Sequence, residues 1–217
     1  MELTSEQQER LRKQFDFILE IDREKEIVRQ TPIADASRHE NDAEHAWHMA
    51  VMVMILSEYA TEKIDPFRTM SMLLIHDLIE IYAGDTYAFD ETAKESQRER
   101  ELLAADRLYQ KLPEDQGRFL RQLWDEFEEQ KTPEARFARA MDNLQPMMLN
   151  KATDGISWVE HGVRLSQVLH RNENTARGSE ILWQYAQENW LKPSVEKGFL
   201  SDDVSGKTDG SPEDTPV

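Results

Sequence analysis

The chain has 217 residues and a formal net charge of −17, a length that suits one domain and a charge that repels long DNA or RNA. It contains no cysteine, which excludes disulfides and thiolate metal ligands. It has neither an apolar run near the ~20 residues that a membrane-spanning helix needs nor an N-terminal signal peptide, so we expect a cytoplasmic protein that does not contact membranes.

Apolar residues at helical spacing predict three helices in the first part of the chain. The first begins with a capping box at Ser5 and Gln8, and the second begins near Asn41 or Asp42, either of which can cap it. The third opens with a proline directly after the cap residue Asp65. A loop separates the first helix from the second. The predicted ranges are residues 5–28, 42–56 and 66–82.

The rest of the chain also has helical periodicity, and no stretch shows sustained strand alternation. Pro146 should kink one of these helices or replace its last turn. The fold class is therefore expected to be all-α, with a single helical domain over residues 1–200 and a disordered tail, rich in Gly, Ser, Pro and acid, over residues 201–217. The helices predicted in this part cover residues 91–112, 115–131, 133–148, 157–171 and 179–191.

Polar residues interrupt an apolar run in the segment Ser71–Tyr82, SMLLIHDLIEIY. On a helix, His76, Asp77 and Glu80 would fall within one arc of about 100°. Burying an unpaired carboxylate is very costly, and a bound cation compensates that cost directly because histidine and aspartate are common metal ligands. The structural alternative for this segment is a buried His–Asp pair that needs no metal.

Two other positions offer ligands of the same kinds. His45 stands near the start of the second predicted helix, with His48 on the same face three residues later. Asp142 lies on a fairly apolar helix, where a carboxylate needs a partner. Each position has a structural alternative, because histidine pairs occur on ordinary helix surfaces and Arg139 could form an ion pair with Asp142.

The order His45 … His76-Asp77 … Asp142 resembles the H…HD…D pattern of the HD-domain superfamily of metal-dependent phosphohydrolases. The similarity spans roughly residues 15–150. Neighbouring residues extend it toward the small branch that contains the bacterial 5′-deoxynucleotidases; these are Arg38, Glu40, Asn41, Glu44, Glu80, Gly84 and Asp85.

The resemblance implies one divalent metal held by His45, His76, Asp77 and Asp142. This mixed set of nitrogen and oxygen donors suits Mn²⁺, Fe²⁺, Co²⁺, Ni²⁺ or Mg²⁺ better than a structural zinc, although Zn²⁺ also fits it. The metal would activate water. Glu80 is then the candidate general acid or base.

Three further residues are candidates for substrate contacts or for orienting water. Asp85 either positions the attacking water or contacts the sugar; its structural alternative is to stabilise the turn after Gly84. Arg29 matches an arginine that contacts the nucleotide in the nucleotidases. Gln30 stands where that branch has a tryptophan that crowds the sugar 2′ position, so strict deoxyribose selectivity is not expected.

The leading hypothesis is a phosphohydrolase that cleaves the phosphomonoester of a nucleoside 5′-monophosphate. A second hypothesis keeps the metal site but changes the substrate to a phosphodiester, a polyphosphate or a sugar phosphate. A third is a helical adaptor that binds metal or nucleotide without turnover. The expected partner is a small phosphorylated substrate, and the resemblance also suggests a homodimer.

Overall fold

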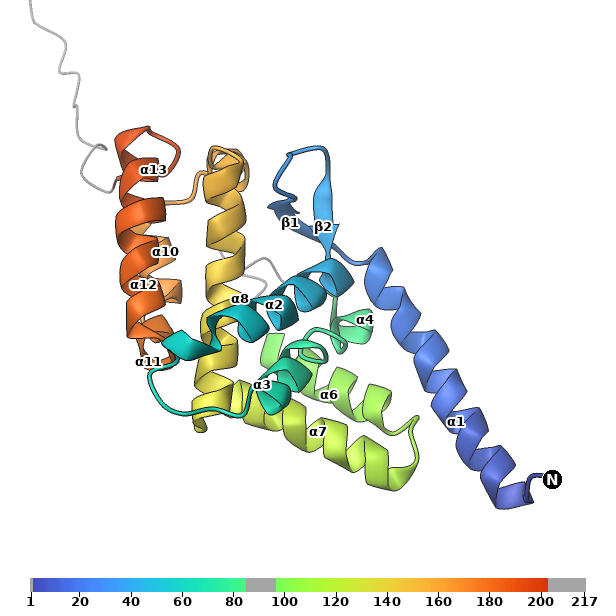
Figure 1. The fold of residues 1–217 in the computed structure, drawn as a ribbon. Helices are drawn as coiled ribbons and strands as arrows, with labels where there is room; N and C mark the ends of the chain where they lie inside the picture. Colours follow the sequence, from blue (N-terminus) through green and yellow to red (C-terminus); the bar gives the residue numbers. More distant parts are fainter. Residues whose placement is uncertain (1, 85–96, 203–217) are drawn as a thin grey trace, which may run out of the picture.

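Short-range capping decides where several helices begin in the computed structural model, which describes residues 2–84 and 97–202 (Figure 1). Asn41 caps α2 (Asp42–Leu56), where its side chain and that of Glu44 exchange hydrogen bonds with backbone amides. Asp65 caps α3 (Pro66–Leu73), and Thr132 caps α8 (Pro133–Ala152). These three predicted starts are confirmed. In α1 (Ser5–Ile21) the capping box is formed by Thr4 and Gln7 instead of Ser5 and Gln8.

The first helix ends earlier than predicted. After α1 the chain forms a short 3₁₀ helix, η1 (Asp22–Glu26), and then strand β1 (Val28–Pro32), which pairs antiparallel with β2 (His39–Asn41). The prediction of a helix to Val28 followed by a loop without strands is therefore wrong. Hydrogen bonds to β2 stabilise the extended backbone at residues 28–32. The spacing of apolar residues within this segment does not reveal such pairing.

The helix predicted over residues 66–82 is interrupted. It ends as α3 at Leu73, turns follow, and a short helix α4 (Glu80–Ala83) begins at Glu80. The carbonyl of Leu73 is contacted by Nδ1 of His76 at 2.9 Å, and the carbonyl of His76 accepts a hydrogen bond from Trp124 at 3.2 Å. A continuous helix would use these carbonyls for backbone bonds four residues on. Side-chain donors therefore replace part of the helical hydrogen bonding here, and the chain at His76 and Asp77 bends instead of forming a helix.

The remaining described elements follow the predicted order with different boundaries. The α8 helix continues through Pro146 to Ala152, so the proline does not end it. The helix predicted over residues 157–171 is divided in two, with a turn at Gly162, whose φ of +58° favours glycine. The later elements are α6 (Gln97–Tyr109), α7 (Glu114–Glu129), α9 (Ile156–Glu160), α10 (Leu165–Arg171), α11 (Thr175–Gly178), α12 (Glu180–Ala186), the π-helical turn η3 (Gln187–Leu191) and α13 (Lys192–Glu196), while η2 (Ser57–Tyr59) follows α2.

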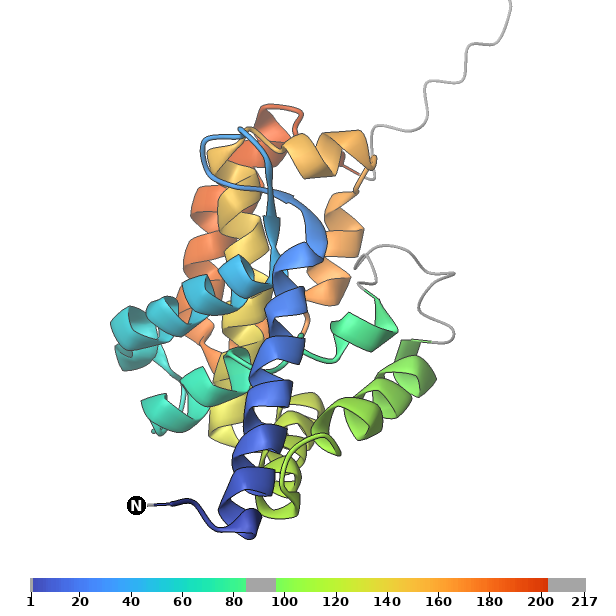
Figure 2. The ribbon, with the colours of Figure 1, turned by 90° about the vertical axis from the view of Figure 1, so that its right-hand side faces the viewer.

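The long helix α8 organises the core. It runs through the middle of the molecule, with α12 and α13 on one side and α2 crossing it on another (Figure 1, Figure 2). Its buried side chains, among them Phe137, Met141 and Leu144, pack with Met49 of α2 and Phe127 of α7 in the main hydrophobic cluster. This packing brings the middle of α8 next to the start of α2 and the turns after α3.

The structure bears out the all-α fold class, with the small hairpin as the exception among the described residues. Within that same part of the chain, no helix has the length and apolar character needed to cross a membrane. The predicted disordered tail begins two residues too early, because Ser201 forms an isolated β-bridge with Arg164; from residue 203 onward the tail lies outside the described residues.

Candidate functional site

Three potential metal ligands meet in the interior of the molecule. His45 comes from α2, His76 from the turns after α3 and Asp142 from the middle of α8, and all three are buried. One donor atom from each residue lies within 4.8 Å of the others. The Nε2 atoms of His45 and His76 are 3.2 Å and 3.7 Å from Asp142 Oδ1. The fold thus gathers three of the four residues that the sequence proposes as ligands.

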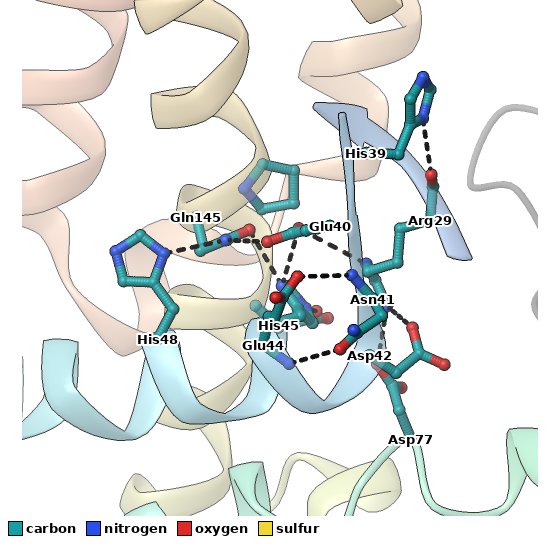
Figure 3. Close-up of polar contacts among 12 residues, drawn as sticks. Arg29, His39, Glu40, Asn41, Asp42, Glu44, His45, His48, Asp77 and Gln145 are labelled. Carbon is teal, nitrogen blue, oxygen red and sulfur yellow. Dashed lines mark hydrogen bonds and ion pairs between the residues drawn. The ribbon is translucent and has the colours of Figure 1, made fainter. Parts of the chain in front are cut away.

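Hydrogen bonds on the far side of each imidazole orient it toward this point. Nδ1 of His45 lies 2.9 Å from Oε1 of Gln145, whose amide nitrogen donates to Glu40 (Figure 3). Nδ1 of His76 lies 2.9 Å from the carbonyl oxygen of Leu73. Because both partners are acceptors, each Nδ1 carries a hydrogen, and each Nε2 is left for the cluster. This arrangement orients a histidine that coordinates a metal through Nε2.

The electrostatics of the cluster favour an added positive charge. Nε2 of His76 is buried and forms no hydrogen bond to any described residue. Burial by itself lowers the pKa of His76, but the carboxylates of Asp77 and Asp142 outweigh it and raise this pKa to about 10. Burial raises the pKa of Asp142, but its contacts with the imidazoles of His45 and His76 outweigh burial and hold this pKa well below its usual range. Imidazole nitrogens and carboxylate oxygens that together attract positive charge fit a divalent cation.

Asp77 lies beside this group and also faces Arg29. Its Oδ2 atom is 3.0 Å from Nε2 of His76 and 2.8 Å from a guanidinium nitrogen of Arg29. Arg29, on β1, is nearly buried and also donates to Asp42 at 3.0 Å (Figure 3). Arg29 therefore holds two carboxylates in this structure. The role of Asp77 as a fourth ligand remains a prediction.

A cavity of about 190 Å³ lies against the ligand group. Arg29, Gln30 and Glu80 all line it, together with His76, Asp77 and Asp142. Gln30 therefore faces the cavity, as the hypothesis about sugar selectivity requires. The predicted site residue Asp85 lies outside the described residues.

Glu80, which lines this cavity, pairs with a second carboxyl group, that of Asp42, and only Glu80 was recognised from the sequence as a site residue. Glu80 begins α4, and its side chain forms a hydrogen bond with Asp42, which is fully buried at the start of α2. Burial raises the pKa of Asp42 to about 6, and the nearby carboxylate of Asp77 adds to the shift. The sequence singled out Asp42 only as a candidate helix cap. An acid in the first turn of a helix is usually exposed, so the sequence carries no signal that this one is buried.

Two further arginines surround Asp142. Arg139 donates to Oδ2 of Asp142 at 3.0 Å and to Glu128 at 2.9 Å, so the ion pair considered from the sequence is present. It coexists with the imidazole contacts because those use Oδ1. Arg171, at the end of α10, lies 4.0 Å from Oδ2 and was not recognised from the sequence. Burial lowers the pKa of Arg171, whereas carboxylate partners outweigh burial and raise that of Arg139.

Comparison with known proteins identifies the family. The family model described as HD domain matches residues 21–183, which is most of the chain. The chain belongs to the HD domain family. The resemblance inferred from the order of His45, His76-Asp77 and Asp142 is thereby confirmed.

Two of the curated relatives carry the name 5′-deoxynucleotidase HDDC2. The human 5′-deoxynucleotidase HDDC2 is 32% identical over 114 residues, which cover 52% of this chain and 54% of that protein. Its mouse counterpart is 31% identical over 114 residues, covering 52% and 56%. The chain therefore spans about half the length of these curated relatives. The crystal structure of a predicted metal-dependent phosphohydrolase from Magnetospirillum magnetotacticum MS-1 is 45% identical, with a TM-score of 0.84, and the match covers 88% of this chain and 96% of that one.

The contact between Gln145 and His45 leads to a test of the HD site that does not depend on activity. Gln145→Leu removes the acceptor that orients His45, so metal affinity should fall by about 10- to 100-fold, the usual cost of losing a group that orients a ligand. Competition with a chelator of known affinity measures the metal dissociation constant. Gln122→Leu, at an exposed position on α7, is the control and should bind metal like wild type. Unchanged metal affinity in Gln145→Leu would show that this contact does not orient a ligand.

Proposed function

We propose that this HD protein is a metal-dependent phosphohydrolase that cleaves the phosphomonoester of a nucleoside 5′-monophosphate. The observation that carries the proposal is the convergence of His45, His76 and Asp142 beside a cavity that His76, Asp142 and Glu80 line. Family membership and the names of the relatives support hydrolysis of a phosphorylated small molecule. The nucleotide substrate is suggested by the deoxynucleotidase relatives, whose similarity extends over half of the chain.

A divalent cation bound here would lower the pKa of a water molecule and withdraw charge from the phosphoryl group. The Nε2 atoms of His45 and His76 and the Oδ1 atom of Asp142 are the donors proposed to hold it, with Asp77 as the fourth. Arg29 fixes Asp77 through their contact of 2.8 Å.

Proton transfer is assigned to Glu80. Its position in the cavity suits a group that accepts a proton from the attacking water or donates one to the leaving alkoxide. The hydrogen bond to Asp42 restrains the orientation of the Glu80 carboxyl group. In this proposal Asp85 assists by orienting water or contacting the sugar.

The composition of the cavity favours hydrolysis over binding alone. A carboxylate in the cavity beside the ligand group has a use in hydrolysis but none in an adaptor that only binds nucleotide. A homodimer remains an expectation from the resemblance; α1 exposes Phe15, Ile18 and Leu19, which are available for such a contact.

Phosphate release from a panel of substrates tests the proposed function. Deoxyribonucleoside and ribonucleoside 5′-monophosphates, a cyclic phosphodiester, a nucleoside triphosphate and a sugar phosphate are each incubated with Mn²⁺, Co²⁺, Mg²⁺ and Zn²⁺. We expect the highest kcat/KM with a nucleoside monophosphate. A clear preference for any other class would replace the nucleotidase assignment, and absence of release from every substrate would favour the adaptor.

Residue 30 should control how strongly the protein discriminates between ribonucleotides and deoxyribonucleotides. Gln30 faces the cavity and is smaller than the tryptophan expected at this place, and its amide can bond to a hydroxyl group. Wild type should therefore discriminate weakly between ribo- and deoxyribonucleotides. Gln30→Trp should raise the deoxy-to-ribo ratio of kcat/KM by about tenfold or more, chiefly by slowing the ribonucleotide.

Arg29→Ala provides the comparison for this experiment. Arg29 acts here by holding Asp77 beside the proposed metal and does not sense the 2′ position, so both sugars should be affected alike. This variant also leaves Asp42 and Asp77 without their arginine, so its thermal stability is measured alongside. A strong deoxy preference in wild type, or an unchanged ratio in Gln30→Trp, would mean that position 30 does not contact the sugar.

A further inference from the structure

The carboxylate of Asp142 separates two kinds of neighbour. Its Oδ1 atom faces the imidazoles of His45 and His76 at 3.2 Å and 3.7 Å. Its Oδ2 atom faces Arg139 at 3.0 Å and Arg171 at 4.0 Å. An anionic group bound in the cavity beside the ligand cluster would therefore lie within reach of these two arginines.

The arginines at this cavity differ in how fully they are paired. Arg29 contacts Asp42 and Asp77 at 3.0 Å and 2.8 Å. Arg139 contacts Asp142 and Glu128 at 3.0 Å and 2.9 Å, and its guanidinium also packs over the ring of Phe127. Each of these two cations already has two short carboxylate contacts, which leave it little capacity for another anion.

Arg171 is paired much more weakly. Within the described residues it forms no hydrogen bond, and the contact of 4.0 Å to Asp142 is its ion pair. Its side chain lines the cavity and is 33% exposed, so it is accessible from the cavity and has room to move. A guanidinium presents several N–H donors in one plane, a geometry that matches the oxygens of a phosphate group.

We propose that Arg171 binds the phosphate group of the substrate in this cavity. The inference rests on the proposed function and deepens it, because it names the residue that recognises the phosphate independently of base and sugar. Neutral ligands without an anionic group should not depend on Arg171. The bond is charge-assisted and formed in a partly desolvated site, where such hydrogen bonds are strongest.

Binding of inorganic phosphate and of 2′-deoxyadenosine 5′-monophosphate tests the proposal without requiring turnover. Both ligands are titrated by calorimetry into protein loaded with Mn²⁺, and 2′-deoxyadenosine serves as the ligand that lacks phosphate. For titrations with the nucleotide, every variant also carries Glu80→Gln, so that the nucleotide is not hydrolysed. Arg171→Gln should weaken both phosphate ligands by about 10- to 100-fold, the range expected for hydrogen bonds to a charged group. Arg171→Lys should lie between it and wild type. Binding of 2′-deoxyadenosine and metal content should not change.

Arg177→Gln is the matched control, because it removes the same charge from an exposed position on α11 that does not line the cavity. Its phosphate affinity should equal that of wild type. Wild-type phosphate affinity in Arg171→Gln would overturn the proposal. So would a loss of metal in Arg171→Gln that matches the loss of phosphate binding, because Arg171 would then act by holding Asp142.

The two proposals fail in different ways. If wild type releases phosphate from no substrate but binds inorganic phosphate through Arg171, the proposed function fails and the phosphate site stands. If wild type hydrolyses nucleotides and Arg171→Gln has unchanged phosphate affinity and KM, the function stands and the role of Arg171 is refuted.

Discussion

His76→Ala is expected to abolish metal retention and phosphate release. The variant removes a buried imidazole whose Nε2 points at Asp142 and whose Nδ1 is held by the carbonyl of Leu73. Activity should fall by well over ~10²-fold, since losing a group that merely orients a ligand costs about 10- to 100-fold. Metal content after gel filtration and initial rates of phosphate release measure the two effects. Asp77→Ala should behave in the same way if Asp77 is the fourth ligand.

Thermal stability gives an independent reading of the same variants. Metal present at a hundred times its dissociation constant should stabilise wild type by about 2.7 kcal/mol and should not stabilise His76→Ala. His170→Ala is the control, because His170 is exposed on α10 and, among the described residues, its side chain pairs only with Glu173. Wild-type metal content in His76→Ala would refute the site as drawn. Wild-type metal content in Asp77→Ala alone would assign Asp77 to the ion pair with Arg29 instead.

Glu80→Gln is expected to retain the fold and most of the metal while kcat falls by about 10²- to 10⁴-fold, the usual contribution of general acid–base catalysis. Glutamine keeps the size of the side chain but cannot exchange a proton. The contact with Asp42 can be kept through the amide, so stability should change little. Metal content, melting temperature and steady-state kinetics are measured on the same preparation.

An exposed glutamate provides the comparison. Glu58→Gln makes the same chemical change in η2, away from the cavity, and should leave kcat unchanged. An unchanged kcat in Glu80→Gln would assign Glu80 a structural role, and the adaptor hypothesis would gain support. A large loss of metal in this variant would instead show that Glu80 supports the ligand group.

Local rules predicted the elements whose stabilising contacts are also local. The caps at Asn41, Asp65 and Thr132 were correct because each cap side chain bonds to a backbone amide two or three residues later. The predicted end of the first helix was wrong, and so was the prediction of an unbroken helix over residues 66–82. A strand pairing across the β1–β2 hairpin and a hydrogen bond from Trp124 to the His76 carbonyl decided them, and neither leaves a periodic signal.

The sequence by itself determined the chemical identity and the order of the candidate ligands. His45, His76-Asp77 and Asp142 stand out because imidazole and carboxylate groups inside apolar segments need a compensating partner, which holds for any fold that buries them. Their order also sufficed for the family, and the family implies a helical fold.

Only the tertiary structure decided how these groups face one another. Gln145 orients His45 from 100 positions away, and Arg29 reaches Asp77 across 48 positions. The two oxygens of Asp142 acquire different neighbours because α8 passes between α2 and α10 in the folded chain. Such contacts depend on the packing of helices, which brings together residues that have no regular spacing along the chain.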